Sequence, residues 1–411
     1  MVLHEHLRAA AAQRGGHTAL ICGGTPYTYA ELQASAERLA AALATLGVGR
    51  GKRVAIYLGN SAEAVIAMYA IWIAGGCIVP IGLATPVERC MKQVQHCGAS
   101  VLIAPGSRSA AIAAATATID ALPHCIWIGT SPVNVRGFMW DKHTGCGTLA
   151  DGSLQELIGG PVAHPAIGAS DLAAIIYTSG SSGTPKGVMH THGSATAAIE
   201  SIVEFLQNSP DDVILSVLQL NFSYGILQLL ATVRTQATLV LENGFGYPYE
   251  VVKQFKRYGV TGFAGAPTIW AMLLQMKDIT PEDFSTVRYI TNAAAAMPPP
   301  FVPRLAALFT HARIYLMHGM TECFRTAYLA PEEALTNPTS IGAPMRNVEL
   351  WLEDENGGKV DAGGEGELII AGPILMSGYW NDPEGTAKML CPRTDGPGHA
   401  LHSGDLFRTD E

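Results

Sequence analysis

Residues 172–188, LAAIIYTSGSSGTPKGV, join an apolar run directly to a loop of glycine, serine and threonine that contains one lysine. The apolar half is typical of a buried strand, and a flexible linker rarely follows such a strand without a break. Gly180, Gly183 and Gly187 allow backbone N–H groups to converge without a Cβ clash, and the hydroxyl groups add donors. Lys186 adds a cation. We therefore expect a phosphate-binding loop after a core strand, although a plain Ser/Gly surface loop remains the alternative from these residues alone.

Strand and helix patterns alternate on both sides of this loop. Upstream, residues 28–47 begin with Thr28 and have Glu31 three positions later, which is the capping-box spacing of a helix start. The expected upstream strands are 52–60 and 99–106. Downstream, the expected strands are 212–220, 237–244, 260–267, 287–294 and 312–319, and the expected helices are 251–259 and 298–310. This alternation predicts an α/β protein with two lobes built on mostly parallel sheets.

Residues 64–82 contain no charged residue over 19 positions, a length that just spans a bilayer. Gly75 and Gly76 interrupt the stretch, and Pro80 follows soon after. We therefore expect a buried helix over 62–74, a glycine turn and a buried strand over 77–82. Such wholly apolar elements occur when helices cover both faces of a sheet.

The pattern changes at about residue 340. Residues 348–360, VELWLEDENGGKV, predict two short strands around a turn at Asn356-Gly357, and residues 364–373 predict a third strand. We expect a small β module with a barrel-like form. Residues 105–165 have a weak pattern and are interpreted as a bridge between lobes. The expected units are residues 1–165, 166–340 and 341–411.

Composition narrows the function classes. Only 15% of the 411 residues are charged and the net charge is −9, with no basic cluster, which argues against nucleic-acid or anionic-membrane binding. The eight cysteines form no C-x-x-C pair and show no zinc-site spacing, so we expect reduced structural thiols. Residues 1–16 carry charges where a signal peptide has its apolar core, and we expect a cytoplasmic location.

Four motifs resemble those of one family, in the same order. Residues 177–188 resemble the signature loop of the acyl-adenylate-forming superfamily, which includes AMP-forming acyl- and aryl-CoA synthetases, nonribosomal peptide adenylation domains and firefly luciferase. Residues 318–322 (HGMTE), 364–386 and 402–406 (HSGDL) are similar to its later motifs. The resemblance covers the large N-terminal domain of that superfamily.

The resemblance implies roles for the phosphate-binding residues. The β- and γ-phosphates of ATP would lie in a loop formed by Thr178, Ser179, Gly180, Ser181, Ser182, Gly183 and Thr184. Lys186 would bind and orient the phosphates, Thr321 would contact the α-phosphate, and Glu322 would hold Mg²⁺. A hard cation of this kind is bound by carboxylate, phosphate and water oxygens.

The resemblance also implies a nucleoside site. Small residues Ala293, Ala294 and Ala295 would let adenine approach the backbone, beside His318, Gly319 and Met320. His318 departs from the aromatic residue, commonly Tyr, that the family has there, and its imidazole would stack on adenine with less area. Asp405 would accept hydrogen bonds from the ribose hydroxyls. Tyr379 and Trp380 are expected to pack within the β module.

The acid would bind near residues 218–230. The expected pocket residues are Phe222, Ser223, Tyr224, Gly225, Ala264 and Gly265. Amino-acid-activating relatives usually have Asp at the position of Ser223, and no charged residue lies between Asp212 and Arg234. A substrate ammonium would lack a counter-ion, and its burial would be costly. We therefore expect a hydrophobic acid, either fatty or aromatic.

The expected reaction is ATP-dependent activation of this acid to an acyl-adenylate, followed by thioester formation with coenzyme A, with Mg²⁺ as cofactor. The alternatives are transfer to an acyl carrier protein and a non-catalytic nucleotide- or acyl-binding protein. A P-loop kinase is disfavoured because no Walker A pattern is present. Relatives continue past HSGDL into a smaller domain with a catalytic lysine, so we expect weak activity from this chain, as a monomer or homodimer.

Overall fold

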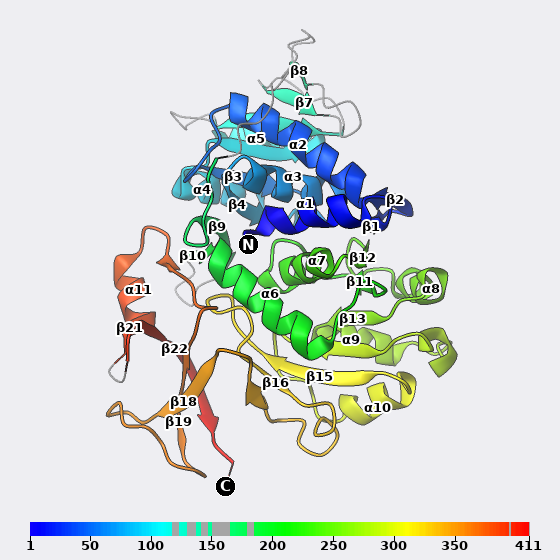
Figure 1. Ribbon diagram of the computed structural model, residues 1–411, viewed down its shortest axis with the longest axis vertical. Helices are drawn as coiled ribbons and strands as arrows, with labels where there is room; N and C mark the ends of the chain where they lie inside the picture. Colours follow the sequence, from blue (N-terminus) through cyan, green and yellow to red (C-terminus); the bar gives the residue numbers. More distant parts are fainter. Residues whose placement is uncertain are drawn as a thin grey trace.

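The computed structural model describes residues 1–116, 123–129, 137–140, 147–149, 165–178, 185–393 and 396–410. Figure 1 shows two α/β lobes along the long axis and a smaller β unit beside the second lobe. The N-terminus lies between the two lobes, and the C-terminus lies at the far end of the β unit. The expected α/β class with two lobes and mostly parallel sheets is confirmed.

The first lobe is built on a nine-stranded sheet. In spatial order its strands are β20 (Gly378–Tyr379), β10 (Lys186–Thr191), β9 (Leu172–Thr178), β4 (Cys77–Ile81), β3 (Arg53–Tyr57), β5 (Val101–Pro105), β6 (His124–Ile128), β7 (Phe138–Trp140) and β8 (Gly147–Leu149). The central strands pair in parallel, whereas β9, β10 and β20 pair antiparallel at one edge. Part of the expected bridge over 105–165 thus extends this sheet as β6, β7 and β8.

The second lobe is built on another nine-stranded sheet. In spatial order its strands are β17 (Ala343–Pro344), β16 (Ala327–Leu329), β15 (Arg313–His318), β14 (Tyr289–Asn292), β13 (Gly262–Gly265), β11 (Val213–Ser216), β12 (Thr238–Leu241), β1 (Thr18–Cys22) and β2 (Thr25–Thr28). The strands from β15 to β1 pair in parallel. Their carboxyl ends therefore meet at one edge, where open α/β sheets bind ligands.

The two sheets take strands from both sides of the proposed boundary at 165/166. Strands β1 and β2 come from the start of the chain but pair in the second sheet, through β1 and β12. Strands β9 and β10 come after the boundary but pair in the first sheet, through β4 and β9. The boundary stays a prediction about folding units, because the sheets themselves exchange strands across it.

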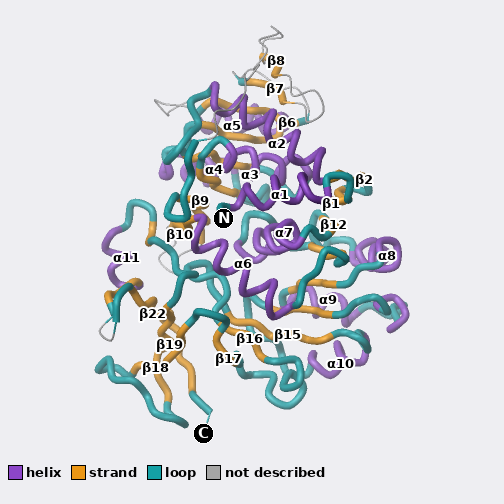
Figure 2. Tube along the Cα trace, in the orientation of Figure 1, coloured by secondary structure: helices purple, strands orange, loops and turns teal. Residues whose placement is uncertain are grey.

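Helices cover the sheets, as Figure 2 shows. They are α1 (Leu3–Arg14), α2 (Tyr29–Thr45), α3 (Ala62–Ile73), α4 (Val87–Cys97), α5 (Ser109–Thr116), α6 (His192–Leu206), α7 (Ser223–Thr235), α8 (Pro248–Tyr258), α9 (Pro267–Gln275), α10 (Phe301–Leu308) and α11 (Pro383–Met389), with short 3₁₀ turns at Gly106–Arg108 and Pro281–Phe284.

The predicted capping box starts α2. The Thr28 hydroxyl accepts the Glu31 N–H at 3.2 Å, and the Glu31 carboxylate accepts the Thr28 N–H at 2.8 Å. The apolar stretch 64–82 forms the buried helix α3 and the buried strand β4, as expected. Among the described helices, none is long and apolar enough to cross a membrane.

The β module is a four-stranded antiparallel sheet. Its strands, in spatial order, are β18 (Glu349–Glu353), β19 (Glu365–Ala371), β22 (His399–Arg408) and β21 (Leu390–Pro392). The predicted second strand of the 348–360 hairpin is wrong, because only an isolated bridge joins Glu353 to Lys359. The Asp354 carboxylate accepts two backbone N–H groups within that segment, which closes it as a turn. Strand β18 pairs with β19 instead.

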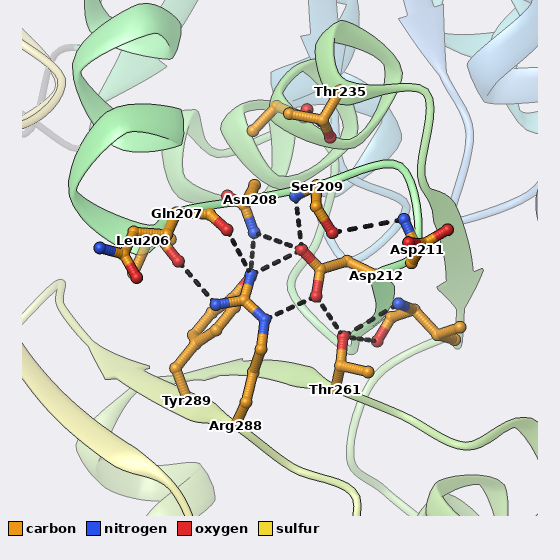
Figure 3. A network of polar contacts seen from close by, with 12 residues as sticks. Leu206, Gln207, Asn208, Ser209, Asp211, Asp212, Thr235, Thr261, Arg288 and Tyr289 are labelled. Atoms are coloured by element: carbon orange, nitrogen blue, oxygen red, sulfur yellow. Dashed lines mark hydrogen bonds and ion pairs between the residues drawn. The ribbon is translucent and has the colours of Figure 1, made fainter.

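An ion pair between the half-buried Arg288 and the buried Asp212 ties the amino ends of the second sheet to α6 (Figure 3). Arg288 donates to both carboxylate oxygens of Asp212 at 2.7 and 2.6 Å, and to the carbonyl of Leu206 at 2.7 Å. The Thr261 hydroxyl and the Ser209 N–H also donate to Asp212, each at 2.7 Å. The carboxylate is thus fully hydrogen-bonded, on the side of the sheet away from the strand carboxyl ends.

Candidate active site

The glycine loop connects two antiparallel strands. Thr178 ends β9, Lys186 begins β10, and these two residues lie opposite each other in the pairing register. The predicted phosphate-binding residues Ser179, Gly180, Ser181, Ser182, Gly183 and Thr184 lie outside the described residues. Thr178 and Lys186 therefore fix where the loop leaves and rejoins the sheet.

A tyrosine joins the lysine of the loop to the glutamate of the HGMTE motif. The Lys186 ammonium lies 4.7 Å from the ring centre of Tyr379, within the range of a cation–π contact. The Tyr379 hydroxyl donates to the Glu322 carboxylate at 2.9 Å. Glu322 is only 8% exposed. The structure thus brings Lys186 and Glu322, two predicted catalytic residues, onto one side chain.

Sequence reasoning assigned Tyr379 to packing of the β module and missed this contact. Strand β20 leaves the module and pairs with β10, with Tyr379 opposite Val188. The backbone N–H of Trp380 also donates to the Gly187 carbonyl at 2.7 Å. A two-residue strand has no readable pattern, so only its place in a family motif could have drawn attention to it.

A histidine of β10 contacts the HGMTE loop and fixes its position. The His190 Nε2–H donates to the Thr321 carbonyl at 2.6 Å, and the His190 ring stacks on Phe324 with centroids 3.8 Å apart. Burial lowers the pKa of His190 to about 4, so the ring is neutral at pH 7 and keeps this donor. Gly319 allows the loop to close, because a Cβ there would collide with the Phe324 carbonyl.

The predicted adenine residues follow the carboxyl end of β14. Ala293 is buried, whereas Ala294 and Ala295 are exposed, and Ala294 has a left-handed φ of 73°. The Asn292 side chain donates to the Ala295 carbonyl at 3.0 Å and accepts from the Trp270 indole at 3.1 Å. This turn lies beside the carboxyl end of β15, because Asn292 pairs with Leu316.

His318 and the HSGDL motif meet at the same edge. The His318 Nδ1 forms a 2.7 Å hydrogen bond with the Thr326 hydroxyl, and its ring meets Phe407 edge-on at 5.3 Å. Burial lowers the pKa of His318, and nearby Asp405 partly offsets this. The described residues give His318 a fixed orientation, and its contact with adenine stays a prediction.

A bulge in β22 presents Asp405. Gly404 has a φ of 75°, and its N–H donates to the Glu367 carboxylate at 2.7 Å. The Asp405 N–H donates to the Ser403 hydroxyl at 3.1 Å. Asp405 is exposed, so its carboxylate is accessible to a ligand.

The predicted acid-pocket residues divide into two groups. Tyr224 and Ala264 form a small buried cluster with Ala293, and the Tyr224 hydroxyl bonds to Thr291 at 2.7 Å. Phe222 lies outside that cluster and is 57% exposed. Ser223 is buried at the first turn of α7.

Gly225 and Gly265 serve close packing. A Cβ on Gly225 would collide with the Gln219 carbonyl, and one on Gly265 would lie 2.6 Å from the Trp270 ring.

One charged residue of this region was not foreseen. Arg325 follows the HGMTE motif, is 3% exposed, and places its guanidinium carbon 4.2 Å from the ring centre of Tyr224. The absence of charge between Asp212 and Arg234 describes only the segment that contains α7. Arg325 comes from a different segment, so proximity in sequence gave no signal for it.

The metal assignment rests on a single carboxylate. No group of three or more His, Cys, Asp or Glu side chains that could hold a metal occurs in the described part of the chain. Glu322 suits a hard cation that takes its remaining oxygens from phosphates and water. The residues present therefore fit Mg²⁺ arriving with a nucleotide.

A model of the AMP-binding enzyme family matches residues 7–380. The chain belongs to that family. This membership confirms the resemblance to acyl-adenylate-forming enzymes that the four motifs indicated.

Relatives within the AMP-binding family use different acyl acceptors. The chain is 30% identical, over 96% of its length and 74% of the other, to a propanoyl:CoA ligase of Mycobacterium tuberculosis whose acyl group carries a methyl-dioxo-octahydroindenyl ring. It is 27% identical, over 96% of its length and 78% of the other, to an L-proline ligase for a prolyl carrier protein of Pseudomonas fluorescens. The structure of apo MatB from Rhodopseudomonas palustris superposes with a TM-score of 0.83 at 26% identity, covering 100% of this chain and 77% of that one.

Proposed function

We propose that the chain activates a carboxylic acid with ATP and transfers the acyl group to coenzyme A. In the first step a carboxylate oxygen attacks the α-phosphorus, giving an acyl-adenylate and pyrophosphate. In the second step a thiolate attacks the acyl carbonyl, a thioester forms and AMP leaves. The observation that carries the proposal is the arrangement of Lys186 and Glu322 around Tyr379, beside the loop that follows Thr178.

The proposed roles follow from the chemistry of each group. Lys186 would bind and orient the β- and γ-phosphates with the loop residues, and Thr321 would contact the α-phosphate. Glu322 would hold Mg²⁺, which when bound neutralises the phosphate charge. Such transfers depend mainly on positioning and electrostatic stabilisation. Asp405 would accept hydrogen bonds from the ribose, with adenine between the turn at Ala294 and His318.

The proposed substrate has an apolar body, either fatty or aromatic. Tyr224, Ala264 and Ala293 form an apolar wall, and Ser223 offers no counter-ion to an amino acid. Coenzyme A is the proposed acceptor. A carrier-protein thiol is the second candidate, since one relative is a carrier-protein ligase.

The decisive assay identifies the nucleotide product. Incubation with ATP, Mg²⁺ and a panel of fatty and aromatic acids should give AMP and pyrophosphate. ADP would indicate a kinase, and no product from any acid would favour a binding protein. Addition of coenzyme A or of an acyl carrier protein then identifies the acceptor. The measured turnover also tests the expectation of weak activity.

Two variants place the reaction at this site. We expect Lys186→Ala and Glu322→Gln each to lower the adenylation rate about 10²- to 10³-fold, the range found when one positioned electrostatic group is removed. Lys253→Ala is the matched control, because this exposed lysine pairs with Glu250 on the surface of α8. Rates that stay within twofold of wild type in both site variants would contradict the assignment.

A further inference from the structure

Arg325 is a buried arginine that forms no ion pair with any described residue. Its Nη1 donates to the Phe324 carbonyl at 2.9 Å, and its guanidinium lies over the Tyr224 ring. Its Nη2 is buried and has no hydrogen-bond partner among the described residues. The Nη1 group therefore has a backbone acceptor and the plane of the guanidinium has an aromatic contact, whereas Nη2 keeps N–H donors that no described residue accepts.

The ring beneath the Arg325 guanidinium carries no charge that could offset it. Burial raises the pKa of the Tyr224 hydroxyl to about 12, so this group is neutral at pH 7. Burial also lowers the pKa of Arg325, but a guanidinium remains protonated in proteins. The fold thus holds a full positive charge in a buried site, which is unfavourable until an anion compensates it.

Arg288 offers a comparison, because it is an arginine with a structural role in the same fold. Arg288 is more exposed than Arg325, yet it forms two hydrogen bonds with the buried Asp212 carboxylate. Arg325 is more deeply buried and has no equivalent partner in the described ranges. Buried ionic groups can often be replaced by well-packed apolar side chains of similar volume without loss of stability, so packing alone does not require an arginine here. The contrast points to a ligand.

The loop geometry directs Arg325 toward the acid pocket. Phe324 has a left-handed φ of 56°, an uncommon conformation for a bulky residue, and its ring is fixed on His190. Arg325 instead contacts Tyr224, which belongs to the apolar cluster with Ala264 and Ala293. The charge therefore lies on the loop that carries Thr321 and Glu322, beside the wall proposed for the acyl group.

We propose that Arg325 binds a second carboxylate of the acyl substrate, so that the preferred acid is a dicarboxylic acid with an apolar body. A carboxylate matches the planar fork of a guanidinium and forms strong charge-assisted hydrogen bonds. This inference rests on the proposed function and narrows its substrate class: one carboxyl group is activated beside Thr321, and the other meets Arg325. Acids that end in a methyl group would leave the buried charge uncompensated.

The first test uses the wild-type chain and pairs of stable acyl-sulfamoyl adenosines. One pair carries hexanoyl and 5-carboxypentanoyl groups, and the other carries benzoyl and 4-carboxybenzoyl groups. Calorimetry should show that the carboxyl-terminated member of at least one pair binds about tenfold or more tightly than its partner, as expected for a hydrogen bond to a buried charge. Equal binding within both pairs, or preference for the uncharged members, would overturn the proposal.

The second test replaces the charge. In the pair of mimics that wild type discriminates, Arg325→Met should abolish the tighter binding of the carboxyl-terminated member. Arg325→Lys should keep part of this difference in affinity. Arg304→Met is the matched control, since Arg304 is exposed on α10 and should leave every affinity unchanged. Melting curves of all three variants show whether they are folded. Preference retained in a folded Arg325→Met variant would also overturn the proposal.

A measurement of AMP affinity tests the inference about Arg325 separately from the proposed function. It also shows whether Arg325 binds the nucleotide phosphate and not the acyl group. Affinity for AMP should be the same in wild type and Arg325→Met, because the proposed partner lies on the acyl group. A large loss of AMP affinity would place Arg325 on the nucleotide and overturn the inference. A wild-type chain that binds neither AMP nor any mimic would contradict the proposed function itself.

Discussion

Tyr379 shows how a single hydroxyl can connect motifs that lie far apart in the sequence. Its ring contacts the Lys186 ammonium, and its O–H donates to Glu322, so one rigid side chain sets the position of both charges. Glu322 is buried, and a buried carboxylate without a donor is costly. Tyr379 is therefore a positioning residue for the proposed metal-binding carboxylate.

Removal of that hydroxyl should be measurable in two ways. Tyr379→Phe should lower the free energy of unfolding by about 1.5–3 kcal/mol, the contribution of a hydrogen bond to a charged group. It should also raise the Mg²⁺ concentration needed for half-maximal adenylation, because Glu322 loses its fixed orientation. Urea unfolding and a Mg²⁺ titration measure these effects. Tyr247→Phe, an exposed control, should change neither. An unchanged Mg²⁺ requirement would assign Tyr379 to packing alone.

At the scale of elements, the sequence pattern identified long apolar strands and missed short ones. Strands such as β9 and β15 have uniform apolar runs and were predicted within a few residues. Strands β16, β17 and β20 have two or three residues, and pairing partners rather than pattern define them. The 348–360 hairpin failed for a related reason: the chain does turn there, closed by the Asp354 carboxylate, but β18 pairs with β19 and not with the segment after the turn.

The ion pair at the amino ends of the strands should affect stability and leave binding intact. Arg288→Met would leave the Asp212 carboxylate, which is 3% exposed in its side chain, without its main partner. We expect a loss of about 3 kcal/mol in unfolding free energy and no change in AMP affinity. Arg346→Met breaks a pair whose two side chains are exposed and screened by solvent, and it should destabilise the fold much less than Arg288→Met does. Equal losses in both variants would contradict this account.

The same network predicts sensitivity to strong acid. Burial acts to raise the pKa of Asp212, but hydrogen bonds from Arg288, Ser209 and Thr261 outweigh it and lower that pKa. The stabilisation is therefore complete above the unfolded pKa near 3.8 and is lost as the pH falls below it. This pH range lies below the one in which the buried histidines, discussed below, take up protons.

At the scale of the whole molecule, α1 lies between the lobes. It packs on α2 and α3 of the first lobe and on α6 and α7 of the second. The Leu3 N–H donates to His192 at 3.3 Å, which requires an unprotonated Nδ1. The sequence located α/β lobes but not this junction, because no local pattern shows that residues 3 and 192 will meet.

Buried histidines should make the whole fold sensitive to mild acid. Burial lowers the pKa values of His6, His190 and His192 to about 4 each. A group with a lowered pKa takes up a proton on unfolding, so its stabilising contribution is full above pH 6.5 and is lost as the pH falls toward 4.

Each of these histidines should lower the unfolding free energy by about 1.4 kcal/mol per pH unit in that window. Urea titrations at pH 7, 6 and 5 measure how the unfolding free energy changes with pH. His192→Gln should reduce this change by the contribution of one histidine. A stability that is flat between pH 7 and 5 would contradict the prediction.

The exchange of strands between the sheets also bears on how the chain is made. Leu20 of β1 pairs with Leu239 of β12. The first strand of the chain therefore cannot pair in its sheet until more than two hundred further residues have been synthesised. Contacts of such separation form slowly, and unpaired strands that wait are prone to aggregate. On the ribosome, the first hairpin will therefore emerge long before its sheet exists. Neither lobe is complete as a nascent chain until much of the other has been synthesised, so we expect the two lobes to fold late and together.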